Sequence, residues 1–140
     1  MQAHAVLAAC PFSVAEAKFA GIMADLESAE AQAMTHSELE RKLAEEGREL
    51  MRLLLQGHLE TRSPGAASAP VVDAEGQERT SQRVHERGLE TVFGKVEVRR
   101  VGYGAEGSDS LHPLDGELNL PRELYSHEVR RRAAEEVAKG

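Results

Sequence analysis

The stretch GLETVFGKVEVRRVGY, Gly88 to Tyr103, decides the fold because apolar and polar residues alternate on both sides of a turn that contains glycine. Alternation with a period of two is typical of a half-buried β-strand. If Phe93 and Gly94 form the turn, the two arms make an antiparallel hairpin. Its core face then carries Leu89, Thr91, Val96 and Val98.

The register of this hairpin determines which charged residues face each other. With the turn at Phe93 and Gly94, Glu90 faces Glu97, and neighbouring cations on that face offset the two acids. Arg87 faces Arg100 with no acid beside them. Like charges opposite each other cost stability unless water, an acid from elsewhere or a bound phosphate separates them. These two arginines are therefore the first candidates for a phosphate-binding site.

The apolar pattern changes sides near the end of the stretch. Val101 and Tyr103 fall on the face opposite to Val98. One extra residue in a strand produces such a change and re-aims side chains, often next to a binding site. The sequence thus predicts a β-bulge near Arg99 and Arg100.

Two helices are expected before the sheet. Ser13 with Glu16 has the spacing of a capping box and predicts a first helix to about Met34. The second box, Thr35 with Glu38, predicts a helix to about Leu59, whose apolar stripe consists of Leu39, Leu43, Leu50 and Leu54.

Gly47 interrupts this second helix at a cost of about 1 kcal/mol relative to alanine. That cost is easier to tolerate where a partner helix packs closely. The two helices are therefore predicted to form an antiparallel arm or to pair with a second copy of the chain.

These patterns predict an α+β protein with an N-terminal helical hairpin or arm, a small antiparallel sheet with a central hairpin, and a C-terminal helix. Ser126 is expected to cap the last helix, with Val129, Ala133 and Val137 on its buried side. The predicted segments are a flexible N-terminus (1–12), two helices (13–61), a linker (62–70), the sheet (71–103), and an ordered loop with the C-terminal helix (104–140).

Composition limits the possible functions. The chain has 140 residues, a formal net charge of -7 and a single cysteine, Cys10. The length fits one domain, and the negative charge argues against indiscriminate binding to an anionic polymer. A lone cysteine suits a reducing compartment, and no membrane-length apolar run is present, so we expect a cytoplasmic protein without a membrane partner.

Few residues suggest catalysis. The six histidines are scattered without metal-ligand spacing. Asp73 and Asp115 are interpreted as turn-forming residues, and no phosphate loop or serine elbow is found. We therefore expect no catalytic residue, no metal site and no cofactor in this chain.

Basic residues concentrate in the middle of the sequence, where guanidinium groups could bind phosphate in a fork. The candidates for DNA contact are Arg79, Arg83, Arg87, Lys95, Arg99, Arg100 and Arg130. Arg131 and Arg132 precede Glu135 and Glu136 by four residues, which favours self-neutralised helical pairs.

Three blocks of sequence, taken together, resemble a known family. They are THSELERKLAEEGRELMRLLLQGHL, VFGKVEVRRVGY and LHPLDGELNLPRELYSHEVRRRAAEEVAKG. In content, order and spacing they are similar to the N-terminal region of bacterial insertion-sequence transposases of the Kra group, from about Phe19 to Gly140. In that family an RNase H-like domain with metal-binding acids follows, and no catalytic residue carries over to this chain.

The resemblance implies a region that helps to recognise transposon ends or to assemble transposase subunits. We expect a truncated, non-catalytic transposase region that contacts transposon DNA. The alternatives are a subunit-assembly module, which forms homo-oligomers through the leucine stripe of the second helix, or a remnant without function.

Overall fold

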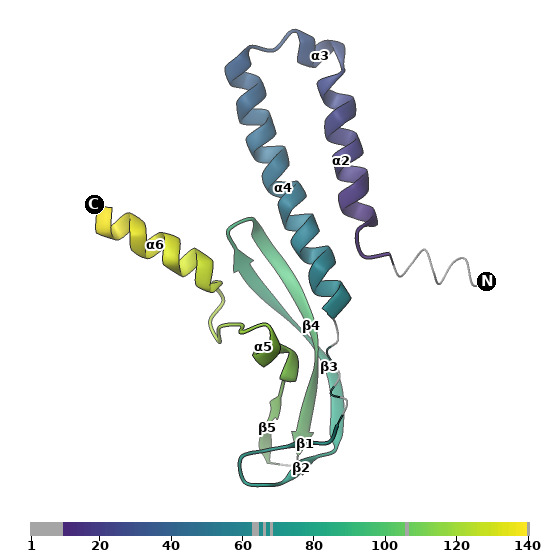
Figure 1. Cartoon of the computed structure of the whole chain (residues 1–140), viewed down its shortest axis with the longest axis vertical. Coiled ribbons are helices and arrows are strands. Elements are labelled where there is room, and N and C mark those ends of the chain that lie inside the picture. Colours follow the sequence, from purple (N-terminus) through teal and green to yellow (C-terminus); the bar gives the residue numbers. More distant parts are fainter. Residues whose placement is uncertain (1–9, 63–64, 66, 68, 106, 140) are drawn as a thin grey trace, which may run out of the picture. The chain divides into compact units, whose positions relative to one another are not determined.

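The computed structural model describes residues 10–62, 65, 67, 69–105 and 107–139. The chain folds as two compact units, one up to His58 and one from Leu59 onward. The first unit is helical, and the second combines small antiparallel sheets with helices (Figure 1). The predicted α+β class is therefore confirmed.

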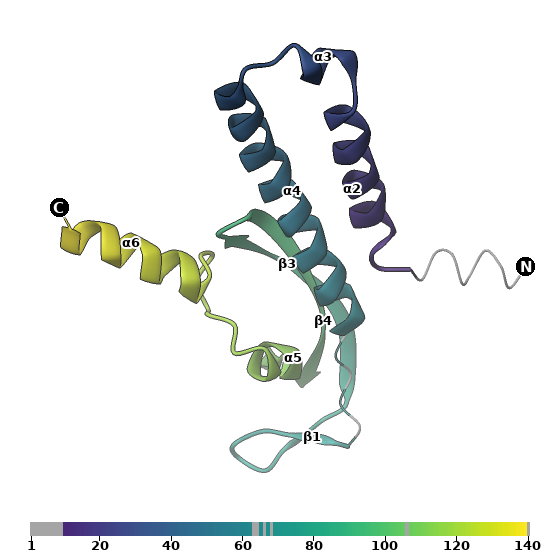
Figure 2. The same cartoon turned by 45° about the horizontal axis from the view of Figure 1, so that its top comes forward.

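The first unit is a helical hairpin. Its helices are α2 (Ser13–Leu26), α3 (Ala29–Gln32) and α4 (His36–Arg62), the last of which continues past the end of the unit. α2 and α4 lie side by side and run in opposite directions (Figure 2). The antiparallel arm is thus present, although the first helix breaks earlier than the predicted Met34.

The caps explain where these helices begin. Thr35 Oγ1 accepts a hydrogen bond from Glu38 N at 3.2 Å, and Thr35 N donates to the Glu38 carboxylate at 2.8 Å, so the second capping box is confirmed. The predicted capping box of Ser13 with Glu16 is wrong. Ser13 is already helical, and its hydroxyl donates to Cys10 O at 3.3 Å. Ser28 instead starts a new helix by accepting from Ala31 N.

The second unit contains two sheets and two helices. β1 (Val71–Val72) pairs with β2 (Glu78–Arg79), and the larger sheet has the order β3 (Ser81–Thr91), β4 (Gly94–Ala105), β5 (Ser108–Leu111). α5 (Pro113–Glu117) and α6 (His127–Lys139) follow. The segment after Tyr103 was expected to be a loop, but it contributes a strand and a short helix.

The register of the β3–β4 hairpin differs from the prediction by two residues. Thr91 pairs with Gly94, so the turn is formed by Val92 and Phe93. Thr91 closes this turn, because its hydroxyl accepts from Phe93 N and donates to Gly94 O. A shift of two residues keeps every side chain on its face. The predicted core residues Leu89, Val96 and Val98 are accordingly buried.

The predicted bulge near Arg99 and Arg100 is wrong. The β3–β4 ladder is unbroken from Ser81–Gly104 to Thr91–Gly94, and the only described irregularity lies between Tyr103 and Ala105, where β4 meets β5. Val101 and Tyr103 are buried on the opposite face of the sheet. The Tyr103 hydroxyl accepts from Ala67 N at 2.8 Å, so Ala67 contacts the Tyr103 side chain from before β1.

The C-terminal helix begins as predicted but is not buried. Ser126 Oγ accepts a hydrogen bond from Val129 N at 3.2 Å, which confirms the cap. No described residue of α6 is buried, and Val137 is 82% exposed. Of the expected buried side, Val129 is half-buried, whereas Ala133 and Val137 are exposed.

Parts of three predicted segments lie outside the described residues. These are residues 1–9 of the expected flexible N-terminus, residues 63, 64, 66 and 68 of the expected linker, and residues 106 and 140 of the expected loop and C-terminal helix. Among the residues that are described, no helix is long and apolar enough to cross a membrane.

Candidate functional site

The face of β3 and β4 that buries Leu89 continues into a group of charged and ionisable side chains. Arg87 and His85 follow on β3 with the same alternation, and Arg100 lies on β4 opposite His85. The junction of β5 and α5 adds His112 and Asp115. These five residues are called the Asp115 cluster below.

α5 holds Asp115 over the sheet. Pro113 occupies the first turn of this short helix, where its fixed φ angle suits the helix and its missing N–H costs nothing. Leu114 is only 1% exposed and anchors the helix to the second unit. Asp115 N donates to His112 O at 3.0 Å, which fixes the acid next to the histidine. Asp115 is thus a helix residue, not the turn residue that the sequence suggested.

The sequence showed no acid beside Arg87 and Arg100 on their face of the hairpin, and in the structure Asp115 is that acid. Arg100 Nη1 donates to Asp115 Oδ2, and Arg87 Nη1 lies 3.5 Å from the same oxygen. Arg87 also donates to the carbonyl oxygens of Pro121 and Glu123, each at 2.9 Å. The Arg87 and Arg100 side chains are 14% and 16% exposed. The expectation of two unpartnered cations facing each other was therefore wrong.

Two histidines complete the cluster. His85 Nδ1 and His112 Nε2 are 3.0 Å apart, with ring centroids separated by 5.3 Å. A hydrogen bond at this distance needs one nitrogen to carry the proton and the other to accept it. Gly102 makes room for the rings, since a Cβ there would lie 2.8 Å from His85 Nδ1 and 2.9 Å from His112 Nε2.

Burial lowers the pKa of His112, and the nearby Arg100 lowers it further, while Asp115 acts in the opposite direction. His85 and Arg87 also lower it. The arrangement therefore favours neutral His112 at pH 7.

Sequence reasoning missed the histidine pair and the role of Asp115. His85 and His112 are 27 residues apart, and spacing rules examine only near neighbours. One signal was available: His85 and Arg87 share the alternation of Leu89, so both had to lie on the buried face. Within the described part of the chain, no three histidine, cysteine or acidic side chains are close enough to hold a metal ion.

Arg79 is also an internal residue. Its Nε lies 3.1 Å from Asp73 Oδ2, its Nη1 donates to Asp109 O at 2.7 Å, and it is 8% exposed. Asp73 in turn accepts hydrogen bonds from Glu75 N and Gln77 N, which builds the predicted turn. These hydrogen bonds lower the pKa of Asp73, and the bond from Gln77 N has the largest effect.

The remaining candidates for DNA contact lie on the surface. The side chains of Lys95, Arg99 and Arg130 are 58%, 56% and 54% exposed, and Arg83 is exposed as well. Lys95 and Arg99 form long ion pairs with Glu97 and Glu86, at 3.9 and 3.8 Å. Arg130 pairs with Glu123 at 3.1 Å. These four cations are therefore exposed, whereas the other three candidates, Arg79, Arg87 and Arg100, are internal.

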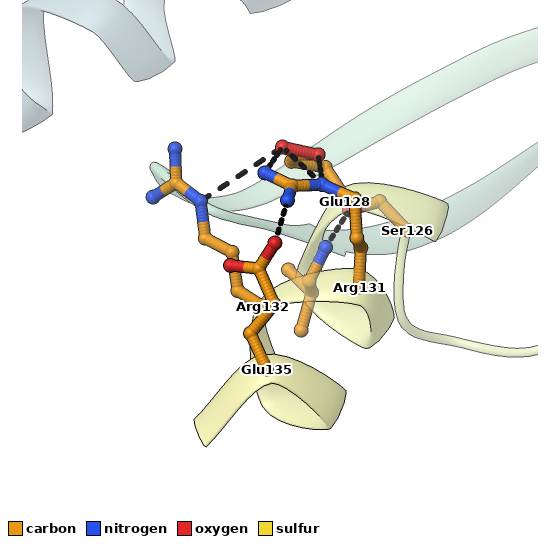
Figure 3. A network of polar contacts seen from close by, with 6 residues as sticks. Ser126, Glu128, Arg131, Arg132 and Glu135 are labelled. Carbon is orange, nitrogen blue, oxygen red and sulfur yellow. Dashed lines mark hydrogen bonds and ion pairs between the residues drawn. The ribbon is translucent and has the colours of Figure 1, made fainter. Parts of the chain in front are cut away.

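The arginines of α6 form their own network (Figure 3). Arg131 binds Glu128 and Glu135, so one of the two predicted pairs is present. Arg132 lies 3.9 Å from Glu128 instead of pairing with Glu136. Hydrogen bonds from Arg131 lower the pKa of Glu128, and this face of the helix neutralises itself.

Comparisons with known proteins identify no relative. The chain matches no family model, no curated protein and no solved structure.

Proposed function

We propose that this chain is the N-terminal region of an insertion-sequence transposase of the Kra group and contributes non-catalytically to DNA transposition in the cytoplasm. In this role it contacts transposon DNA and needs no metal or cofactor of its own. The resemblance of the three sequence blocks supports the proposal. Arg100 from the second block binds Asp115 from the third, so these two blocks are parts of one folded unit.

The observation that carries DNA contact is the exposure of four cations: Lys95 and Arg99 on one face of the hairpin, Arg83 on the opposite face, and Arg130 on α6. Exposed ion pairs contribute only about 0 to 1 kcal/mol, so a phosphate can replace the acids that Lys95 and Arg99 now contact. Contacts of this kind position a protein on DNA without reading its sequence. The proposed contact is accordingly an electrostatic one, made by a few side chains of an otherwise acidic chain.

The test compares two double variants that remove equal charge. Arg83→Ala with Arg99→Ala removes proposed phosphate contacts, whereas Arg131→Ala with Arg132→Ala removes cations of the self-neutralised α6 network. Fluorescence anisotropy with a labelled DNA duplex at low salt should show roughly tenfold weaker binding for the first variant and little change for the second.

Absence of binding by the unaltered chain, or equal losses in both variants, would refute the proposed contact. Substitution of Arg87 or Arg100 is not a suitable test. Both are held by Asp115, so their loss would disturb the fold together with any DNA contact.

A second candidate function, assembly of subunits, is favoured by the leucines of α4. Leu43 and Leu54 from the predicted stripe are 41% and 38% exposed, whereas Leu39 and Leu50 are half-buried. The chain thus presents apolar side chains of the kind that bind another protein surface.

A further inference from the structure

The two faces of the β3–β4 hairpin differ in charge. The register places Arg83 on the same face as Arg87 and Arg100. Among the described residues of β3 and β4, no acid lies on this face, and Asp115 of α5 forms ion pairs with the two inner arginines. The opposite face carries three acids and two cations, which are Glu86, Glu90, Glu97, Lys95 and Arg99. The face of Arg83 is therefore the basic face of the hairpin.

The basic face is bare where two glycines of β4 lie on it. Gly102 is opposite Arg83, and Gly104 is opposite Ser81. The two histidine rings of the Asp115 cluster fill the space above Gly102. A Cβ at Gly104 would meet only Ser110 Oγ among the described atoms beyond its chain neighbours, at 3.4 Å. The surface above Gly104 is therefore open, with a serine on each side.

Gly104 lies near the end of β4, at the irregularity between β4 and β5. Its φ is outside the positive range, so the backbone there does not require glycine. Glycine in a strand often marks a place where a ligand approaches the backbone closely. The missing side chain at Gly104 leaves room for such a ligand on the basic face.

Hydrogen-bond donors surround this bare surface. Arg83 is the diagonal neighbour of Gly104 across the ladder, a separation that a long side chain spans. It is exposed and forms no ion pair with a described residue. Ser81 and Ser110 lie on the two sides of Gly104. Ser81, Arg83, Gly104 and Ser110 are called the Gly104 site below.

The chemistry of this site suits a phosphate group. Phosphate oxygens accept hydrogen bonds, so a guanidinium fork can donate to two of them while hydroxyl groups donate to others. Arg87 and Arg100 add positive charge on the same face, and the single carboxylate of Asp115 offsets only part of it. Asp109 precedes Ser110 and, by strand alternation, belongs to the opposite face. The site therefore combines donors, positive charge and open space.

We propose that the Gly104 site binds one phosphate group. Arg83 and Ser81 donate to the phosphate from β3, Ser110 donates from β5, and the bare Gly104 lets the phosphate lie against the sheet. The inference goes beyond DNA contact, because the phosphate can belong to a nucleic-acid backbone or to a small phosphate compound. The same chemistry binds both, so the experiment has to separate them.

Three single variants test the position of the site. Gly104→Ala keeps every charge but places a methyl group where the phosphate is expected, at an ordinary contact distance from Ser110 Oγ. Arg83→Ala removes the main donor. Arg99→Ala is the matched control, since Arg99 is also an exposed arginine of this hairpin but lies on the opposite face.

NMR chemical shifts of the isotope-labelled full chain measure binding. Inorganic phosphate, compared with chloride at equal ionic strength, should shift the amide signals of the Gly104 site in a saturable way. Gly104→Ala and Arg83→Ala should each raise the dissociation constant for phosphate roughly tenfold, because the first removes the steric fit and the second a charge-assisted hydrogen bond. Arg99→Ala should leave it within about twofold.

Three results would overturn the proposal: no saturable shift at the site, equal shifts with chloride, or a response that survives both Gly104→Ala and Arg83→Ala. Circular dichroism of the three variants checks that each keeps the fold of the unaltered chain.

Fluorescence anisotropy with a labelled DNA duplex identifies the source of the phosphate. If Gly104→Ala weakens DNA binding as strongly as Arg83→Ala, the site holds a phosphate of the DNA backbone. If Gly104→Ala abolishes only the response to inorganic phosphate, the site belongs to a small phosphate compound. A chain that binds inorganic phosphate at the site but no DNA would refute the proposed DNA contact and leave this inference intact.

Discussion

At the scale of single residues, Asp115 determines what the central arginines do. In the sequence, Arg87 and Arg100 have no acid on their own face of the hairpin. In the structure, one carboxylate from α5 serves both. Sequence alternation correctly predicted that the hairpin has a buried face. It could not predict Asp115, because the acid comes from another element 15 residues after Arg100.

Removal of this carboxylate should destabilise the second unit. We expect Asp115→Asn to lower the free energy of unfolding by roughly 1 to 3 kcal/mol, the cost of leaving largely buried charged groups without their partner. Urea denaturation followed by circular dichroism measures the change. Glu123→Gln removes the acid of the exposed Arg130 pair and should cost less than about 1 kcal/mol. Equal losses in the two variants would contradict the structural role assigned to Asp115.

At the scale of elements, the β3–β4 hairpin shows what alternation can and cannot specify. Registers that differ by two residues place the same side chains on the same face, so the pattern of burial cannot distinguish them. The turn decides between them. Gly94 has a φ of 118°, which glycine tolerates, and it follows the turn instead of belonging to it. The faces were therefore predictable, but the cross-strand partners were not.

α6 illustrates a similar limit. Its cap and apolar stripe follow from local sequence, and the cap is confirmed by the Ser126 hydrogen bond. Helical periodicity identifies the apolar side of a helix, but it cannot show whether anything covers that side. Val137 is therefore exposed, although its position in the stripe suggested burial.

The contact between β3 and the β5–α5 junction should depend on pH. The pKa of His112 is lowered in the folded chain, so the unfolded chain binds a proton more readily. Stability is then complete above the ordinary histidine pKa of 6.5 and decreases as the pH falls through it toward the lower folded value. Protonation of both rings would also remove the acceptor between His85 and His112.

Urea denaturation at pH 7.5 and at pH 5.5 measures this dependence. We expect the unaltered chain to be less stable at the lower pH, and we expect His112→Gln to reduce the difference. His36→Gln is the control, because His36 is highly exposed at the start of α4. An equal pH dependence in the unaltered chain and in His112→Gln would contradict this explanation.

At the scale of the whole molecule, charge limits how the chain can hold DNA. The net charge is -7, and four of the proposed cations are exposed: Arg83, Lys95, Arg99 and Arg130. Each neutralised phosphate contributes about 0.9 to the slope of log affinity against log salt, so the slope should be no steeper than about -4.

A salt titration of the anisotropy assay measures this slope. The variant without Arg83 and Arg99 should have a slope shallower by about 2, because two phosphate contacts are lost. A slope much steeper than that of four contacts would mean that the internal arginines also reach DNA, against the structure described above.

The class and the order of the main elements follow from helical and alternating patterns in the sequence. The boundary between the two units, near His58, lies inside α4, shortly before the linker that the sequence predicts at 62–70. The strand β5 and the helix α5 were missed because Gly107, Pro113 and Gly116 make that segment look like a loop.

Because of the position of β3 in its sheet, the charged residues of this strand also affect aggregation. β3 is an outer strand of its sheet, and on its open side the described chain pairs only with Glu90, through a bridge to Tyr125. Open strand edges tend to recruit strands of other molecules, and charged side chains discourage that recruitment. In the run SQRVHER, residues 81–87, Arg83 and Glu86 are exposed along this edge. Charged residues on β3 can therefore keep molecules of this protein apart, whatever else they bind.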